Sequence, residues 1–326
     1  MKKPANKKLA KPKRTKKGIK TLSIIVPVYE NAGSLSLLFA TLDNVEKKLA
    51  TMKVAVEFIF VDDGSQDNSL SLLLAFHRKK KNVRVIKLSR NFGEMAAIKQ
   101  GAMTVKGDAF VAIAADLQDP PELLVEMVSR WQQGKKYVIA VRRSRQDPWI
   151  SKLLSAFYYS LLRWLVLPNF PKGGFDMALM DKIFLPFIQN SSKSFYAPIL
   201  SHWLGFEPSI IYYDRAARHH GQSKWTLGKK ISAFLDIMLG FSIKPIRFIS
   251  VIGFLVAVAS FVFGIYSIVE YFMGGQHIRG YTSVFVVMTF LFGLIIIMLG
   301  VIGEYLWRVF NETNKRPSAV VEEIFS

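Results

Sequence analysis

The chain has 326 residues, of which 51% are apolar, and its formal net charge at pH 7 is +20. This length allows a full catalytic domain together with a smaller part, and apolar content combined with positive charge is ordinary for a protein at a membrane. The chain contains no cysteine, which excludes disulfide bonds and thiolate zinc sites.

Residues 1–20 form a basic tail with nine lysines, Arg14 and no acidic residue. This composition predicts a disordered segment. Each basic residue near an anionic lipid surface would contribute about 1 kcal/mol of attraction, and the simpler interpretation is a solvated tail. Because no recognition module follows the tail, we do not expect a nucleic-acid partner.

Short apolar runs then alternate with segments of helical periodicity as far as residue 122. The runs that predict strands lie within 21–31, 56–61, 83–88 and 110–115, and helices are predicted over 34–50, 69–76 and 94–105. This alternation indicates an α/β fold with a parallel, doubly wound sheet. Right-handed crossovers bring the carboxyl ends of such strands to one edge. The side chains expected to meet at that edge are Tyr29, Glu30, Asp62, Asp63, Arg90 and Asp116.

The run over 110–115 ends abruptly in Asp116-Leu117-Gln118-Asp119, and Pro120-Pro121 follow. The prolines are expected to stop the strand and to start a helix. Oxygen ligands at a strand end suit a hard divalent cation that carries phosphates, and the alternative is a capped turn without a ligand. Neither glycine-rich phosphate-loop pattern occurs in the sequence. Carboxylates, a metal and a few basic groups are therefore expected to hold a nucleotide.

Four segments in this order resemble the family 2 glycosyltransferases, and within them the polyprenyl-phosphate glycosyltransferases, which include bactoprenol glucosyltransferases and dolichol-phosphate-mannose synthases. The segments are Ser23–Asn31, Val61–Asp67, Ser89–Gly93 and Ala115–Glu122. The resemblance covers roughly residues 21–322 and implies a GT-A, Rossmann-like domain over 21–243. It also implies a nucleotide-sugar donor (UDP-glucose by default), Mg²⁺ or Mn²⁺, and a polyprenyl phosphate acceptor such as undecaprenyl phosphate. The implied donor-binding residues are Pro27, Tyr29, Glu30, Asp62, Asp63, Arg90 and Asp116.

One position departs from the family pattern. The family often writes its metal motif as Asp-x-Asp, and position 114 here is Ala. The resemblance then implies that Asp116 and Gln118 hold the metal together with donor phosphate oxygens and water, which magnesium tolerates. A non-catalytic membrane scaffold of the same fold is the alternative that Ala114 suggests.

Beyond residue 136, a strand is predicted over 137–141, followed by Arg142, Arg143 and Arg145, which either hold phosphates or form a solvated loop. The segment 150–167 predicts an amphipathic helix in the lipid interface, with a buried core helix as the alternative.

Asp176 ends the segment Gly173-Gly174-Phe175-Asp176. The resemblance implies that Asp176 contacts sugar hydroxyls, and a helix N-cap is the other interpretation.

The segment from Arg218 to Lys224 is similar to the Arg-x-x-Gly-x-Ser-Lys pattern that precedes the membrane part of the family. Guanidinium groups fit phosphate with two hydrogen bonds. We therefore expect the lipid-phosphate ligands to be Arg215, Arg218, Ser223 and Lys224. A purely electrostatic membrane patch is the alternative.

Two uncharged apolar runs, Phe248–Val269 and Tyr281–Gly303, predict membrane-spanning helices, since each exceeds the roughly 20 residues that a span requires. Their short connection predicts a hairpin, with spans of about 248–270 and 281–304 inside 244–310, after a juxtamembrane helix near 225–243. Basic residues flank the outer ends, which places the catalytic domain and both termini in the cytoplasm. The expected location is a bacterial inner membrane, with a multi-pass topology.

The tail 311–326 looks like the family's C-terminal segment, which can add a strand to a neighbouring subunit. This implies a homo-oligomer, with a tetramer possible, and a frayed terminus is the alternative.

These expectations combine into an inverting, metal-dependent transferase for cell-envelope glycans. The acceptor phosphate is already an anion, so the work is positioning and charge neutralisation. Asp116, Asp176 and Arg218 are the expected catalytic residues. A processive polysaccharide synthase is disfavoured, because Ser160 breaks the Gln-x-x-Arg-Trp motif before Arg163 and more membrane helices would be needed.

Overall fold

The computed structural model describes residues 19–326 except 144–148, 193–195, 215–226, 274–280 and 315. The strands are β1 (Lys20–Val28), β2 (Val54–Asp62), β3 (Val83–Leu88), β4 (Ala109–Ala112), β5 (Tyr137–Arg142), β6 (Phe175–Asp181), β7 (Ser209–Tyr213) and β8 (Val321–Phe325). The helices are α1 (Ala32–Thr51), α2 (Ser69–Lys79), α3 (Glu94–Met103), α4 (Leu123–Gln132), α5 (Trp149–Leu165), the 3-10 helix η1 (Lys182–Phe184), α6 (Leu185–Gln189), α7 (Ala197–Trp203), α8 (Leu227–Phe241), α9 (Lys244–Phe272) and α10 (Tyr281–Thr313).

The described strands form one sheet in the order β7-β5-β6-β4-β1-β2-β3-β8. Strands β1 to β4 run parallel, as predicted. Two strands outside the segment from which a parallel sheet was predicted run the other way: β6 is antiparallel to β4 and β5, and β8 is antiparallel to β3. Val141 at the end of β5 pairs with Phe175 at the start of β6. The segment that contains α5 therefore returns the chain to the edge where β5 ended, and β6 has to run back across the sheet.

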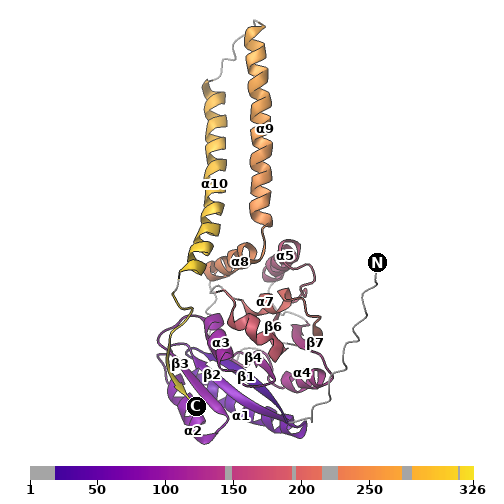
Figure 1. Ribbon diagram of the computed structural model, residues 1–326, viewed down its shortest axis with the longest axis vertical. Helices are drawn as coiled ribbons and strands as arrows, with labels where there is room; N and C mark the ends of the chain where they lie inside the picture. Colours follow the sequence, from indigo (N-terminus) through magenta and orange to yellow (C-terminus); the bar gives the residue numbers. More distant parts are fainter. Residues whose placement is uncertain (1–18, 144–148, 193–195, 215–226, 274–280, 315) are drawn as a thin grey trace, which may run out of the picture.

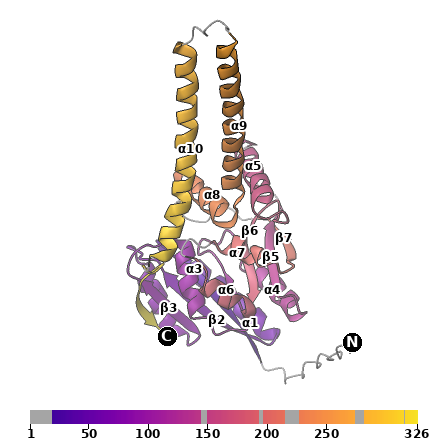
Figure 2. The same ribbon diagram turned by 45° about the horizontal axis from the view of Figure 1, so that its top comes forward.

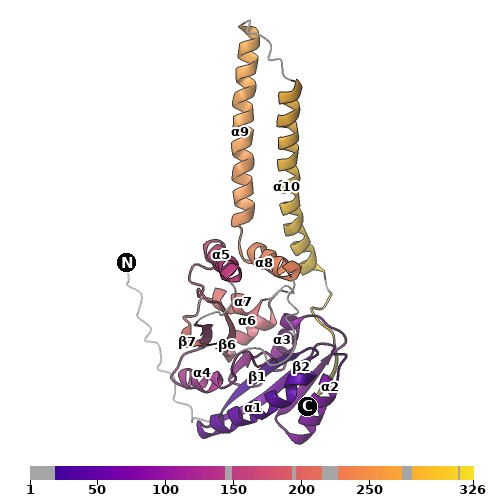
Figure 3. The same ribbon diagram turned by 180° about the vertical axis from the view of Figure 1, so that it is seen from behind.

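Helices cover both faces of the sheet and enclose two apolar cores. One face is covered by α1, α2 and α4, and the other by α3 and α5 to α8 (Figures 1 and 3). The periodicity predicted for the first helix is confirmed, because the residues α1 buries in the first core are Leu35, Leu38, Leu42, Val45 and Leu49. Both faces of the sheet are thus covered by helices, and the ends of its strands remain for a ligand.

Helices α9 and α10 project from the α/β domain on the side of α5 and α8 (Figures 1 and 2). Within the described residues, both are long and apolar enough to cross a membrane, and none of either apolar window is buried in the protein. At its domain end, α10 is joined to α8 by an ion pair between Arg308 and Asp236 at 3.0 Å. The hydroxyl of Tyr305 also donates to the Ser242 carbonyl at 2.9 Å. The hairpin is therefore anchored to the domain through α8.

Helix α5 lies at the base of this hairpin (Figure 3), and its side chains divide between buried and exposed. Leu162 is fully buried, and Tyr158 and Tyr159 pack against the same core. Phe157 and Trp164 are 66% and 64% exposed. Helix α5 therefore buries one side in the core, as the second interpretation expects, and exposes the other; its place in the lipid interface stays a prediction.

The C-terminal tail adds a strand to its own sheet, since β8 pairs with β3. Lys87 and Glu322 form an ion pair at 2.6 Å, and the Ser89 N–H donates to the Val320 carbonyl at 3.0 Å. The predicted strand is thus present and pairs within one chain, so the frayed terminus is wrong. The homo-oligomer stays a prediction. Pairing covers the open edge of β3, which would otherwise invite other strands.

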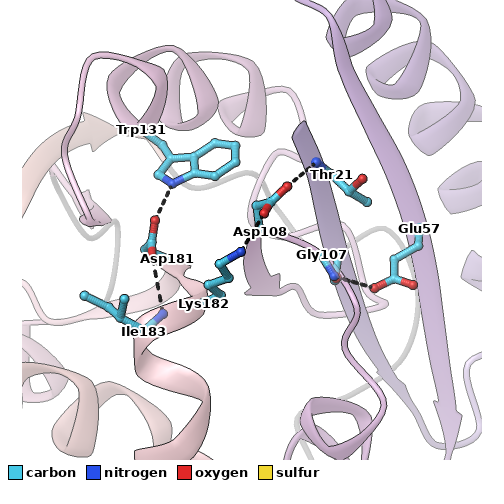
Figure 4. Close-up of polar contacts among 9 residues, drawn as sticks. Thr21, Glu57, Gly107, Asp108, Trp131, Asp181, Lys182 and Ile183 are labelled. Atoms are coloured by element: carbon cyan, nitrogen blue, oxygen red, sulfur yellow. Dashed lines mark hydrogen bonds and ion pairs between the residues drawn. The ribbon is translucent and has the colours of Figure 1, made fainter. Parts of the chain in front are cut away.

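A cluster of polar side chains links neighbouring segments at the amino ends of β1 and β4 (Figure 4). Asp108 accepts from the Thr21 N–H at 3.2 Å and from the Lys182 ammonium at 2.9 Å. Asp181 accepts from the Trp131 indole N–H at 3.0 Å, and Glu57 from the Gly107 N–H at 3.1 Å. These side chains satisfy one another, so this cluster is structural.

Candidate active site

The carboxyl ends of β1 to β5 and β7 and the start of β6 lie along one edge of the sheet. Register places Val28 beside Asp62 in β1 and β2, and Arg142 beside Tyr213 in β5 and β7. The predicted meeting of residues from the first four strands is therefore confirmed by the topology. The same edge also brings in side chains from the second half of the chain.

Side chains after β2 hold the loop that follows β1. The contacts are Glu30 N–H to Ser65 Oγ at 3.0 Å, Asn31 N–H to Ser69 Oγ at 2.9 Å and Ala32 N–H to Asp67 Oδ2 at 3.1 Å. Glu30 has a φ of 53°, a left-handed conformation that costs a residue other than glycine about 1–3 kcal/mol. These contacts fix the backbone around the predicted donor-binding residues Pro27, Tyr29 and Glu30.

Asp62 and Asp63 are both buried at the end of β2. Asp62 Oδ2 accepts weakly from the Ser65 N–H at 3.4 Å, and its Oδ1 is buried with no hydrogen-bond partner among the described residues. Asp63 instead accepts from the Phe92 N–H at 2.7 Å and from the Gly93 N–H at 2.9 Å. Burial raises the pKa of each carboxyl. Asp62 can accept from a ligand, whereas Asp63 holds the loop before α3.

The loop before α3, which contains Arg90, packs closely on the turn after β2. Gly64 has a φ of +71°, and a β carbon there would lie 2.5 Å from the backbone carbonyl carbon of Arg90, so only glycine fits. The Arg90 guanidinium lies 4.0 Å from the centre of the Phe92 ring. Arg90 is thereby held at the edge where it was predicted.

The loop after β4 carries the predicted metal ligands. Its strand ends at Ala112, earlier than predicted, so Asp116 lies in the turn that follows. The Ser34 hydroxyl donates to the Ala115 carbonyl at 2.8 Å, and the Gln118 N–H donates to Asp116 Oδ1 at 3.2 Å. Leu117 is buried and has a φ of 58°, a strained conformation maintained by its surroundings.

Negative charge accumulates beside this loop. Although part of the Glu94 side chain reaches solvent, burial of its carboxyl group and the charges of Asp116 and Asp119 raise its pKa. In the part of the chain that the structure describes, no three acidic or histidine side chains form a ready-made metal cage. A divalent cation that also uses phosphate oxygens needs only one or two protein carboxylates. The surplus negative charge and the oxygen donors of Asp116 and Gln118 fit such a cation.

Four side chains connect this loop to the far end of the edge. The Tyr213 hydroxyl donates to Asp119 Oδ1, and Tyr213 lies beside Arg142 in the register of β7 and β5. Arg142, which is almost fully buried, also forms an ion pair with Asp176. Asp176 lies in β6, so its interpretation as a helix N-cap is wrong; Asp181 occupies an N-cap, with the Ile183 N–H 3.2 Å from Oδ1.

Aromatic side chains border the Arg142–Asp176 pair. Gly174, with a φ of +64°, packs so tightly on Tyr159 of α5 that a β carbon would overlap the phenol ring. Burial raises the pKa of Tyr196, and its charged neighbours include Glu94 and Arg142. Helix α5 thus contributes to the edge as well as to the base of the hairpin.

The predicted lipid-phosphate ligands Arg215, Arg218, Ser223 and Lys224 lie outside the described residues. The described chain reaches Asp214 directly after β7 and resumes at α8, beside α10. The predicted loop arginine Arg145 also lies outside the described residues.

Sequence reasoning placed Asp119 at the strand end beside Asp116 and Gln118, but it gave no site role to Glu94, Tyr159, Tyr196 or Tyr213. Tyr213 carried a usable signal, because the apolar run Ile210–Tyr213 before Asp214 has the composition of a strand. That strand would have placed Tyr213 at the same edge. The contacts of Tyr159 and Tyr196 depend on helix packing, for which the sequence has no local signal.

Comparison with known proteins finds that the model of glycosyl transferase family 2 matches residues 23–194. An uncharacterized glycosyltransferase of Synechocystis sp. is 34% identical over 93% of this chain and 95% of its own. The prophage bactoprenol glucosyl transferase homolog of Escherichia coli is 31% identical over 93% of this chain and 99% of its own. A crystal structure of Staphylococcus aureus TarS residues 1–349 with UDP-GlcNAc covers 68% of this chain and 65% of that one, at 15% identity and a TM-score of 0.44.

Proposed function

Because the chain belongs to glycosyltransferase family 2, we propose that it transfers one glucose from UDP-glucose to a polyprenyl phosphate, with inversion, at a membrane surface. The product would be a polyprenyl-phosphate sugar that serves cell-envelope glycan modification. Undecaprenyl phosphate is the acceptor that we propose first.

The observation that carries this proposal is the extent of the likeness to proteins named bactoprenol glucosyl transferases. That of Shigella phage SfX is 31% identical over 92% of this chain and 98% of its own length. A match of this extent continues past the family domain and into the apolar helices, which begin at Lys244. The likeness thus extends over both the family domain and the apolar helices, which supports a lipid acceptor.

The nucleotide would lie against the ends of β1 and β2. The buried, unpartnered Oδ1 of Asp62 is suited to an N–H of the base. Pro27, Tyr29 and Glu30 line the neighbouring loop, and Arg90 supplies positive charge next to it. Asp63 acts indirectly, by holding the loop of Arg90.

The diphosphate would lie at the loop after β4, where Asp116 and Gln118 would hold Mg²⁺ or Mn²⁺. When bound, the cation supplies positive charge to the departing diphosphate. Asp176, in its ion pair with Arg142, would present its carboxylate to sugar hydroxyls.

The acceptor phosphate would be held by Arg215, Arg218, Ser223 and Lys224, which join β7 to α8 in the sequence. Because a phosphate ester is already anionic at neutral pH, these residues would act by orienting it in line with the anomeric carbon. Attack from that side inverts the configuration.

Helices α9 and α10 would span the membrane as a hairpin. The basic residues at the outer ends of the pair support a cytoplasmic α/β domain and cytoplasmic termini. Exposed Phe157 and Trp164 of α5 would then lie at the headgroup level, where aromatic side chains are favoured.

The test is transfer by purified protein in vesicles that contain undecaprenyl phosphate. The vesicles would be incubated with Mg²⁺ or Mn²⁺ and separately with radiolabelled UDP-glucose, UDP-N-acetylglucosamine and UDP-galactose. A mild-acid-labile lipid product carrying one glucose is expected. Arg218→Ala should reduce transfer by about ten- to a hundredfold, the equivalent of one charge-assisted contact, with donor binding retained.

Other outcomes point to specific alternatives. Transfer of a different sugar would keep the reaction and correct the donor. Products with several sugars would indicate a polysaccharide synthase. Metal-dependent donor binding without transfer to any lipid phosphate, or no binding at all, would contradict the proposal and favour a scaffold with Ala114 at the metal motif.

A further inference from the structure

Tyr213 lies between Asp119 and the Arg142–Asp176 ion pair at the edge of the sheet that carries the candidate site. It lies at the end of β7 and is 6% exposed. Its hydroxyl donates to Asp119, which is also 6% exposed, and Tyr213 lies beside Arg142 in the register of β7 and β5. Because β5 and β6 lie between β7 and β4, this one hydroxyl links parts of the edge that no backbone pairing joins.

The residues on both sides of Tyr213 are held by further contacts. The backbone N–H of Arg143 donates to the Tyr213 carbonyl at 2.8 Å, so pairing with the end of β5 fixes the position of Tyr213 along its strand. Arg142 pairs with Asp176 from β6. Asp119 lies three residues after Asp116, in the same turn.

We propose that Tyr213 is a positioning residue that holds the Asp116 loop in register with the Arg142–Asp176 pair. This role rests on the proposed function, in which the loop contacts the diphosphate and the pair contacts the sugar. In this role Tyr213 acts through Asp119 and through its place beside Arg142. It sets the spacing between the two halves of the donor pocket.

The chemistry of the hydroxyl suits this role. Burial and the charge of Asp119 raise the pKa of Tyr213, so it remains a hydrogen-bond donor at neutral pH. The hydroxyl therefore donates to a buried carboxyl oxygen, and this contact fixes the orientation of Asp119.

The principal variant is Tyr213→Phe, which removes one oxygen and keeps the ring. Its matched control is Tyr212→Phe, since Tyr212 is the neighbour in the same strand and is 56% exposed. For Tyr213→Phe we expect kcat with UDP-glucose and undecaprenyl phosphate to fall about ten- to a hundredfold, because small misplacement of reacting groups has effects of this size. The KM of each substrate should change less than about threefold, and Tyr212→Phe should resemble wild type.

The second measurement needs no substrate. Hydrogen–deuterium exchange of the folded protein in detergent should be faster over residues 114–122 in Tyr213→Phe and unchanged in Tyr212→Phe. The double variant Tyr213→Phe/Asp119→Ala should lose little more kcat than Asp119→Ala alone, because both changes break the same bond.

The outcomes separate this proposal from the function on which it rests. Unchanged exchange over 114–122, or faster exchange across the whole domain with a lower melting temperature, would overturn the positioning role. Losses in kcat that multiply in the double variant would do the same. The remaining outcome is faster exchange confined to residues 114–122 in Tyr213→Phe, together with a wild-type protein that does not use UDP-glucose. That result would support the positioning role of Tyr213 and would contradict the proposed function.

Discussion

Asp62 and Asp63 are neighbours in the sequence, yet the fold gives their carboxylates different partners. Asp63 has both oxygens occupied by backbone N–H groups of the loop before α3. Asp62 has one buried oxygen without a partner among the described residues. A motif that supplies two acids thus separates into one that supports the site and one that can bind a ligand.

Asp63→Ala should destabilise the protein, whereas Asp62→Ala should mainly weaken donor binding. Removing Asp63 leaves two N–H groups without their acceptor, and hydrogen bonds to charged groups contribute about 1.5–3 kcal/mol each. Thermal unfolding of both variants, together with titration of UDP-glucose, distinguishes the two roles. Equal melting temperatures for the two variants would contradict the assignment of Asp63 as the support.

Asp116→Ala should abolish transfer while the protein remains folded. Asp116 is half-buried in the turn after β4, where the fold places surplus negative charge and where we propose the cation. The matched control is Glu122→Gln, an exposed acid in the same connection. A variant that keeps more than about a tenth of wild-type turnover, equivalent to a barrier change below roughly 1.4 kcal/mol, would exclude Asp116 as the main metal ligand.

At the scale of elements, the first half of the fold could be predicted because its signals are local. Apolar runs such as Val83–Leu88 and the periodicity of Leu35, Leu38 and Leu42 each lie within one element. Parallel crossovers then determine the common edge without any long-range information. The positions of Asp62 and Asp116 follow from that rule alone.

The second half could not be predicted in the same way, because its positions depend on contacts between distant segments. The direction of β6 follows from where α5 lies, and β8 reaches β3 from the far end of the chain. The link from Tyr213 to Asp119 joins residues 94 positions apart. A single sequence carries no local pattern for contacts of this kind.

Asp108, in the polar cluster at the amino ends of β1 and β4, should make a contribution to stability that depends on pH. The hydrogen bond from Lys182 lowers the pKa of Asp108 below its ordinary value of 3.8. A carboxyl group whose pKa is lower in the folded state stabilises the protein above pH 3.8, and this contribution disappears as the pH falls through the folded pKa. Asp108→Asn should therefore lower the melting temperature most near pH 7, and the difference from wild type should vanish in acid. A difference that grows as the pH falls would contradict this sign.

The whole molecule separates its charges from its apolar surface along the chain. Residues 1–20 contribute nine lysines and Arg14, which is half of the net charge of +20. The large exposed apolar side chains of α9 and α10, such as Phe254, Phe261, Phe290 and Ile296, lie at the other end of the chain. These features would bind a membrane by different forces. Exposed charges are screened by salt, whereas buried apolar area is worth about 25 cal/mol per Å² regardless of salt.

Deleting residues 1–18, which precede β1, should therefore weaken adhesion to anionic vesicles and leave the protein integral to the membrane. The matched control replaces the nine basic residues of this segment with glutamine, which keeps its length and removes its charge. Each basic residue contributes about 1 kcal/mol near an anionic surface, and this attraction falls off within a Debye length. Both variants should remain in the membrane fraction after washing with 1 M salt, an ionic strength at which the Debye length is about 3 Å.

The decisive comparison is with a chain in which a polar linker replaces residues 244–313 and β8 is kept, so that the edge of β3 stays covered. Release of the tail-deleted protein by salt alone would show that α9 and α10 do not span the bilayer, despite their length and apolar composition. If the hairpin spans, the chain without α9 and α10 should be extracted far more readily by the same wash, because only screened charges and the exposed aromatic side chains of α5 would hold it.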